Sequence, residues 1–236
     1  MSAPIFHFDL KQYLFDPNDP YNYQANEEWL ALRADRITAS VAGDLFVNGK
    51  SASGLGANII DKLERRVMQR YSGWIDDDSL SFQEKEAVRR GIIYEREAME
   101  WYSRKTGRRL MNCGFVQRGQ FLGCSPDSVV EGERRLVQCK IPMPQNFIRE
   151  VMAQGKDHLA QCKTELYVSD FEVNDLLIYS PELKLGWIRE ITRDPIHDRT
   201  LLSKVRVAVK HQRNCIDVVE KLMNHNGGYD GSSYNA

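Results

Sequence analysis

The sequence has almost no surplus of either charge. Its 32 lysines and arginines nearly balance 33 aspartates and glutamates, so the net charge is −1 and the pI is near 6.5. A protein that coats nucleic acid without specificity needs bulk basicity, and this composition argues against that class. An enzyme that confines its basic residues to a channel remains open, because the local charge decides binding there.

The chain also lacks long apolar runs, paired cysteines and internal repeats. No segment has the pattern of a membrane span or a signal peptide, so we expect a soluble intracellular protein. The five cysteines are odd in number and lie mostly in apolar segments, which is typical of reduced thiols and not of disulfides or a zinc site. The five histidines show no ligand spacing. With 236 residues and 42% hydrophobic content, the chain can bury one sizeable core, which favours a single α/β or α+β domain.

Apolar periodicity predicts both helices and strands. Residues 1 to about 24, rich in Pro, Asp, Asn and Tyr, predict an irregular N-terminal arm, and residues 226–236 predict a flexible tail after a domain that spans 1–225. Helices are expected near residues 26–35, 39–47, 55–72, 81–106, 157–168 and 195–224, and strands near 110–117, 120–124, 128–131, 135–140, 172–180 and 185–193.

Two chemically active side chains lie on neighbouring strand-like segments. Asp127 closes the apolar segment Phe121–Gly123, and Lys140 closes the segment that starts at Leu136 after a charged turn. This pattern predicts a hairpin-like unit with an aspartate on one strand and a lysine on the other. Residues two apart in a strand share a face, so positions 138 and 140 point the same way, whereas Cys139 offers only its backbone carbonyl.

This layout resembles the PD-(D/E)xK nuclease core, in which Asp, Glu and Lys converge on a metal ion and a scissile phosphate. Magnesium prefers oxygen ligands, and in such sites it activates water and stabilises the leaving oxygen. The position two before the lysine is acidic in that core, but here it is Gln138, which keeps a carbonyl oxygen and lacks the charge. Spacings of this kind are common by chance, so other segments must decide.

Four further segments occur in a fixed order around this unit. Together with Gly-Cys-Ser-Pro-Asp and Lys-x-Pro, they resemble the phage lambda exonuclease family, also called YqaJ-type alkaline exonucleases, over roughly residues 25–225. The resemblance implies an α/β fold with a mixed central sheet flanked by helices. The four segments are Trp29-x₃-Arg33, Ile37-Thr38-Ala39-Ser40, Gly91-x₃-Glu95 and Leu159-Ala160-Gln161.

The resemblance implies a metal site. Asp127 occupies the position of the metal-binding aspartate, Gln138 that of the metal-binding glutamate, and the Cys139 carbonyl that of a further ligand. Glu95 corresponds to a helix glutamate behind the metal, acting directly or through water. The implied cofactor is Mg²⁺, two ions in the active form, which Mn²⁺ can replace. Taken alone, Glu95 is equally well an exposed acid paired with Arg96.

Catalysis is implied for two further residues. Lys140 matches the catalytic lysine, and Gln161 matches a helix glutamine that supports it, although a plain helix-surface residue is the other reading of Gln161. A tyrosine of the family is His158 here.

A 5′-phosphate pocket is implied by Arg33, Ser40 and Ser125. The family carries a second phosphate-binding arginine where this chain has Asn146, and whether Arg149, one turn further along, replaces it stays open. A terminal phosphate carries close to two negative charges, so one arginine fork with hydroxyl and backbone donors would favour it over a diester. We expect Ser40 to cap or open the helix that follows it, where N–H groups attract anions. A solvated Arg33 and a ligand-free cap at Ser40 are the alternatives.

Val88 matches the position of a wedge residue in this family. It lies two turns before Glu95 between Ala87 and Arg89-Arg90. An apolar wedge can part the terminal base pair, and the two arginines could hold the backbone phosphates beside it. An ordinary core valine is the other interpretation.

Two functions from different classes follow. The first is a Mg²⁺-dependent 5′→3′ exonuclease that acts on double-stranded DNA. It degrades the 5′-phosphorylated strand and leaves a 3′ overhang for single-strand-annealing recombination, and in this chain Gln138 inactivates it. Asp127, Lys140, Glu95, Arg33 and Ser40 all remain, and an isolated Glu-to-Gln change beside them is what a deliberate inactivation would produce. The second is a nuclease-fold protein that binds DNA ends or a recombination partner without cutting. A site-specific endonuclease ranks third.

The partners come only from the resemblance. It implies double-stranded DNA ends as substrate, a ring-shaped homotrimer, a single-strand annealing protein as partner, no membrane, and the cytoplasm of a bacterial host with a phage or prophage origin.

Overall fold

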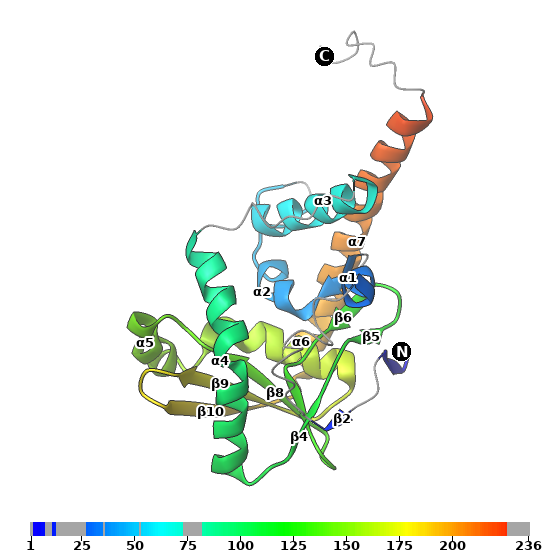
Figure 1. Ribbon diagram of the computed structural model, residues 1–236. Helices are drawn as coiled ribbons and strands as arrows, with labels where there is room; N and C mark the ends of the chain where they lie inside the picture. Colours follow the sequence, from blue (N-terminus) through cyan, green and yellow to red (C-terminus); the bar gives the residue numbers. More distant parts are fainter. Residues whose placement is uncertain are drawn as a thin grey trace.

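The computed structural model describes residues 2–7, 11–12, 27–34, 36–51, 53–72 and 82–225. Two mixed β-sheets with helices packed against them form this part of the chain (Figure 1). The expected fold class, a mixed sheet flanked by helices, is confirmed. The tail expected at 226–236 and most of the N-terminal arm lie outside the described residues.

The larger sheet has six strands in the order β10-β9-β8-β7-β4-β2. β8 and β9 are parallel from Arg135 opposite Val173 to Lys140 opposite Ile178, and the other neighbours are antiparallel. A parallel pair requires a crossover, which here contains two helices, α5 and α6. The strands are β2 (Lys11–Gln12), β4 (Leu110–Asn112), β7 (Ser128–Val130), β8 (Arg135–Lys140), β9 (Val173–Ser180) and β10 (Leu185–Thr192).

The smaller sheet has four strands in the order β1-β5-β6-β3. Only β3 and β6 are parallel in it. The strands are β1 (Pro4–Phe6), β3 (Ile37–Thr38), β5 (Val116–Arg118) and β6 (Leu122–Cys124).

Three expectations about strands were wrong. The single strand expected at 110–117 is two strands, β4 and β5, in different sheets, because the chain turns at the buried residues 113–115 and passes from one sheet to the other. The expected irregular arm contains β1 and β2, which pair with β5 and β4. Asp127 follows β6, but the strand paired with β8 is β7, which begins directly after Asp127.

Helices cover both faces of the larger sheet. Short 3₁₀ turns at Ala39–Val41, Pro144–Asn146 and Lys156–His158 precede α2, α5 and α6. α5 was not expected, because six residues are too few to show a helical period. The helices are α1 (Glu27–Ala34), α2 (Ala42–Leu45), α3 (Ala57–Ser72), α4 (Phe82–Thr106), α5 (Phe147–Met152), α6 (Leu159–Ser169) and α7 (Pro195–Asn224). Among the described residues, no helix is long and apolar enough to cross a bilayer.

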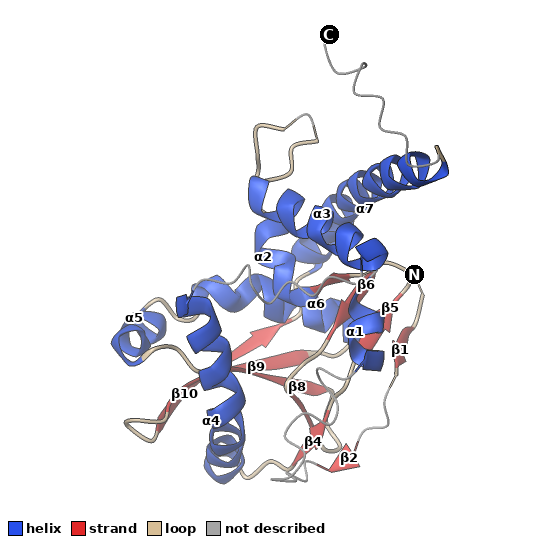
Figure 2. Cartoon of the chain, turned by 45° about the horizontal axis from the view of Figure 1, so that its top comes forward, coloured by secondary structure: helices blue, strands red, loops and turns tan. Residues whose placement is uncertain are grey.

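Alternation along the central strands divides the core into two clusters. On β9, Leu177 and Tyr179 pack with α4, whereas Leu176 and Ile178 pack in the cluster that contains the buried side chains of α6. α4 therefore covers one face of the sheet and α6 the other (Figures 1 and 2). On β8, Leu136 belongs to the α6 side, so positions 138 and 140 face α6 as well.

Candidate active site

Asp127 lies where the chain enters β7. Its Oδ2 accepts hydrogen bonds from the Gln138 amide at 2.5 Å and from the backbone N–H of Cys139 at 2.6 Å. Burial raises the pKa of Asp127 to about 6, although the charge of Lys140 and these two hydrogen bonds lower it. The carboxylate is thus fixed against β8, at the centre of the larger sheet.

Gln138 uses both ends of its amide in this site. It is 3% exposed, and its Nε2 donates to Asp127 and, at 3.4 Å, to the Cys139 carbonyl. Its Oε1 accepts from Gln161 Nε2 at 3.0 Å, and Gln161 Oε1 accepts from Lys140 Nζ, also at 3.0 Å. Gln161 therefore bridges positions 138 and 140 from α6, and it is not a plain surface residue.

Glu165 is a member of the site that sequence reasoning missed. It is fully buried one turn after Gln161, whose Nε2 donates to it at 2.8 Å, and Asn174 Nδ2 on β9 donates to its other oxygen at 2.8 Å. Burial raises the pKa of Glu165 to about 8, with a smaller contribution from the charge of Asp127. The spacing of four between Gln161 and Glu165, which places both on one helix face, was the available signal.

Glu95 approaches the same group from α4. Burial first, and then the charge of Asp127, raise the pKa of Glu95 to about 8, while Lys140 opposes the shift. Its expected alternative partner Arg96 instead donates to Glu100 at 2.8 Å. Glu95 is therefore a buried acid close enough to Asp127 for the two negative charges to repel each other.

The donor set fits a hard cation. The charge of Asp127 raises the pKa of both Glu95 and Glu165, and Lys140 is the cation that acts on all three acids, so ionising all three leaves uncompensated negative charge. A divalent ion held by carboxylate and carbonyl oxygens would remove that repulsion, and these are the ligands that Mg²⁺ prefers. The Cys139 thiol packs among the apolar side chains of the α4 cluster, and burial first, then the charges of Asp127 and Glu95, raise the pKa of this thiol well above its usual range, so it stays protonated and adds no soft ligand.

A second group of side chains lies next to Asp127 in the sequence. Ser125, two residues earlier, accepts a hydrogen bond from Trp29 Nε1 on α1 at 2.9 Å. The guanidinium of Arg33 lies over the Trp29 ring, 4.1 Å from its centroid. The structure thus brings the predicted Arg33 and Ser125 together through a tryptophan.

The local backbone explains why the Gly-Cys-Ser-Pro-Asp segment can adopt this position. A Cβ atom at Gly123 would lie 2.1 Å from the Phe115 ring, which packs directly on the backbone of β6. Only glycine tolerates that approach. The contact positions the strand that leads into Ser125 and Asp127.

Ser40 does not cap a helix as expected. It lies inside the 3₁₀ turn Ala39–Val41, and its hydroxyl pairs with Thr38 Oγ1 at 3.0 Å. The reason is that the turn begins one residue early, with Thr38 in the capping position and no side-chain cap bond. Arg66 on α3, which sequence reasoning missed, donates to the same Thr38 Oγ1 at 3.1 Å.

The sequence pattern of the YqaJ-like viral recombinase domain matches residues 28–172, more than half of the chain. The chain belongs to this family. The fold is similar to that of an alkaline exonuclease (LHK-Exo) from Laribacter hongkongensis, with a TM-score of 0.70 and 21% identity over 85% of this chain and 99% of that one. A phage-related exonuclease from Haemophilus somnus 129PT gives a TM-score of 0.62 and 13% identity over 80% and 96% of the two chains. No curated protein matches the sequence.

Within the described part of the chain, two residues discussed from the YqaJ resemblance, Arg149 and His158, make no interaction with Arg33. Arg149 is exposed on α5, and no interaction between described residues links it to Arg33 or Ser125. His158 lies beside Glu150, Nε2 to Oε2 3.2 Å. Burial and the charge of Lys140 lower the pKa of His158. It therefore contributes no fixed positive charge near neutral pH.

Val88 is 54% exposed on α4, so it is not a core valine. The two arginines that follow it, Arg89 and Arg90, were expected to contact backbone phosphates, and only Arg89 is exposed enough to do so. Arg90 is 8% exposed and pairs with Glu182 at 2.8 Å, so its charge is already compensated. Arg89 is exposed to solvent.

Two other features of this YqaJ-family chain lie outside the site. Glu64, His211 and Cys215 face one another between α3 and α7, with His211 Nε2 3.1 Å from Glu64 and 3.6 Å from Cys215. The expectation that no histidine has ligand spacing was therefore wrong at His211, four residues before Cys215.

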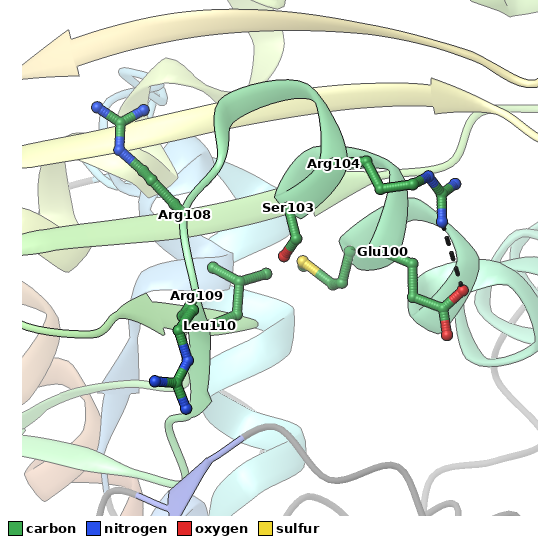
Figure 3. Close-up of a pocket in the computed structure, with 7 residues that line it drawn as sticks. Glu100, Ser103, Arg104, Arg108, Arg109 and Leu110 are labelled. Atoms are coloured by element: carbon green, nitrogen blue, oxygen red, sulfur yellow. Dashed lines mark ion pairs between the residues drawn. The ribbon is translucent and has the colours of Figure 1, made fainter.

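A pocket of about 330 Å³ lies near the C-terminal end of α4 (Figure 3). Its arginines are paired with acids: Arg104 with Glu100, Arg108 with Glu133 and Arg109 with Glu131. This pocket therefore offers no uncompensated cation to an anionic ligand.

Proposed function

We propose that this protein is a magnesium-dependent 5′→3′ exonuclease on double-stranded DNA, which degrades the 5′-phosphorylated strand and leaves a 3′ overhang. One observation carries the proposal. An acid cluster with a single lysine lies two residues along the chain from Ser125, which is linked through Trp29 to Arg33. A nuclease that starts at an end needs both parts, a hydrolytic site and a grip on the terminal phosphate.

The hydrolytic part rests on Asp127, position 138, the Cys139 carbonyl and Glu95 as holders of Mg²⁺. The ion would supply Lewis-acid stabilisation of the scissile phosphate and a lowered water pKa. Lys140 orients the attacking water and offsets phosphate charge. Gln161 holds the Lys140 ammonium by accepting its hydrogen bond at 3.0 Å, which keeps that charge toward the acids.

The end-binding part rests on Arg33. Its guanidinium is fixed by the Trp29 ring, and among the described residues no carboxylate lies within ion-pair distance of it. A preorganised, uncompensated arginine is suited to a phosphate monoester, which presents more charge than an internal diester. Ser125 and Ser40 add hydroxyl donors.

One observation favours a second function, DNA-end binding without cleavage. Gln138 satisfies Asp127 with an amide hydrogen bond, so the site needs no cation to neutralise that pair. In this protein as it stands, a metal held at Asp127 would have to displace that bond. Magnesium-dependent cleavage is therefore expected to be slow in this chain and fast when position 138 carries a carboxylate.

A linear duplex with one 5′-phosphorylated end tests the proposal. The Gln138→Glu variant should release nucleotides from that end in Mg²⁺ or Mn²⁺, spare a 5′-hydroxyl end, and leave the opposite strand intact. Release from 3′ ends, or internal nicking of a closed circle at the same rate, would contradict it.

The proposal extends to assembly, as the family resemblance implies. A homotrimeric ring would keep the enzyme on one duplex, and a single-strand annealing protein would receive the 3′ overhang. The mass of the native particle in solution tests the first point. Co-purification of the chain with the annealing protein of the same phage or prophage tests the second.

A further inference from the structure

Arg66 reaches the same region as Arg33 from a different helix. Its Nη1 donates to the backbone carbonyl of Arg36, and its Nη2 donates to Thr38 Oγ1 at 3.1 Å. Two of its donors are thus used to fix the segment that carries Ser40. The guanidinium lies close enough to Arg33 for the two charges to repel each other.

These two arginines have no compensating acid. Burial first, and then the charge of Arg66, lower the pKa of Arg33 to about 10, and burial lowers that of Arg66 to about 10. Within the described ranges, neither has a carboxylate within ion-pair distance. Four other arginines with little exposed surface differ, because each is paired with an acid: Arg90 with Glu182, Arg118 with Asp170, Arg135 with Asp175 and Arg193 with Asp198.

Two neighbouring, partly desolvated cations without an acid are unfavourable in the absence of a ligand. An anion that contacts both would remove the repulsion and restore the lost solvation. The ligand chemistry is therefore that of a compact group with more than one negative charge. A phosphate monoester carries about −1.5 to −2 near neutral pH, whereas a diester in the DNA backbone carries about −1.

Hydrogen-bond direction adds a second role for Arg66. Because Thr38 Oγ1 accepts from Arg66, its own proton is available to Ser40 Oγ, 3.0 Å away. Ser40 is exposed, so its proton is then free to point toward a ligand. A chain of donors in one direction strengthens each of its members.

We propose that Arg66 is the second cation of the 5′-phosphate pocket, that it contacts the terminal phosphate together with Arg33, and that it orients Ser40 as a donor through Thr38. The proposal rests on the proposed function, because it takes the ligand to be the 5′ end of a DNA strand. It also assigns a second arginine to the pocket in place of Arg149, which is exposed on α5.

Binding measurements on the chain as it stands, in EDTA to prevent cleavage, test the proposal. The probes are two duplexes that differ only in a 5′-phosphate or a 5′-hydroxyl. Arg66→Gln should reduce the preference for the phosphorylated end about tenfold or more, as expected for one charge-assisted contact. Arg65→Gln is the matched control, since Arg65 is the adjacent arginine on α3 and pairs with Asp61 at 2.9 Å.

A role confined to supporting the Arg36–Ser40 segment gives a different result. Arg66→Gln would then lower the thermal unfolding temperature while its end preference stayed equal to that of Arg65→Gln, and this would overturn the proposal. Should Arg66→Gln fail to fold, Arg66→Lys replaces it. Lysine keeps the charge but cannot bridge Arg36 and Thr38, so the end preference should fall several-fold. An unchanged preference in Arg66→Lys would overturn the proposal as well.

If the proposed function is wrong, the binding measurements give a third result. In that case the parent chain itself shows no preference between the two ends. A parent preference that Arg33→Ala abolishes and Arg66→Gln leaves intact supports the proposed function and removes Arg66 from it. A double variant, Arg66→Gln with Ser40→Ala, should lose less of the binding preference for the phosphorylated end, in free energy, than the sum of the losses in the two single variants, because Arg66 acts partly through Ser40.

Discussion

Replacing Gln138 with glutamate is the most informative change to this protein. The amide now donates to Asp127 Oδ2 at 2.5 Å, and its oxygen accepts from Gln161. Glutamate would keep the second contact and turn the first into a contact between two carboxylates. At 2.5 Å, two unit charges repel by about 7 kcal/mol at an effective dielectric constant of about 20.

That repulsion has two consequences of opposite sign. Without metal, one of the two carboxyls must hold a proton or the site must open, so Gln138→Glu should destabilise the metal-free protein at neutral pH. With Mg²⁺, the same repulsion becomes attraction to the ion. A recovered principal ligand is worth several kcal/mol of transition-state stabilisation, which is roughly a thousandfold or more in rate.

Two assays follow the two consequences. Initial rates on a 5′-phosphorylated linear duplex in Mg²⁺ should differ between the two proteins by that factor. The increase in unfolding temperature caused by Mg²⁺ should be larger for Gln138→Glu than for the parent chain. Cys215→Ser is the control, since it removes a thiol from the other cluster of potential ligands, between α3 and α7. Equal rates and equal Mg²⁺ shifts for the two proteins would refute the reasoning and leave Asp127 and Glu95 as the sole metal-binding acids.

Four further outcomes are expected. Arg33→Ala, in the Gln138→Glu background, should reduce the preference for phosphorylated ends by about 2–3 kcal/mol and shorten processive digestion, whereas an unchanged ratio of rates on the two ends would place the pocket elsewhere. Val88→Ala, in the same background, should slow digestion of a blunt duplex up to about tenfold, and a pre-frayed 5′ end should restore the rate. Equal slowing on both substrates would mean that Val88 only supports the fold. The pKa of Glu165 is raised to about 8 in the folded chain, so the free energy of unfolding should fall as the pH rises from about 4.5 to 8. In urea unfolding, the free energy of Glu165→Gln should depend less on pH than that of the parent, by at most about 1.4 kcal/mol per pH unit. Parallel pH dependences for the two proteins would exclude this effect. Asp194 caps α7, and chiefly the hydrogen bond from Lys163 lowers its pKa to about 2. Asp194→Ala should therefore lower the free energy of unfolding by about 1 kcal/mol at pH 7, and by progressively less as the pH falls below about 4. A loss of stability that does not change with pH would contradict the capping argument.

The fold was predictable where a segment carries its own period. Helices α3, α4 and α7 and the strands β8, β9 and β10 begin and end within two residues of the expected bounds, since long amphipathic or alternating segments record their burial directly. No periodic pattern in the sequence predicts that residues 110–118 are divided between two sheets. Both strands are three residues long, and their separation depends on which partners they pair with.

The site was predictable to the extent that its residues lie in motifs. Asp127, Gln138 and Lys140 are close in sequence, so a strand period was enough to relate them. Arg66 could not be found in this way, because α3 packs against a distant segment, and the only sequence signal for Glu165 was its spacing of four from Gln161. Burial without an ion pair between described residues identifies both of them, and burial is a property of the fold and not of a motif.

The short chain between Ser125 and Asp127 connects the two halves of the proposed function. Two residues span at most about 7 Å, so a phosphate held by Ser125 and a phosphodiester held at Asp127 must be near neighbours on one DNA strand. Gly123 packs beneath Phe115 and fixes the start of this connection, and the Trp29 hydrogen bond at 2.9 Å fixes Ser125 itself. The distance between the two phosphates is therefore set by the backbone and is independent of base identity. Under the proposed function, such an arrangement would remove nucleotides one at a time from any sequence, with specificity for the 5′-phosphate.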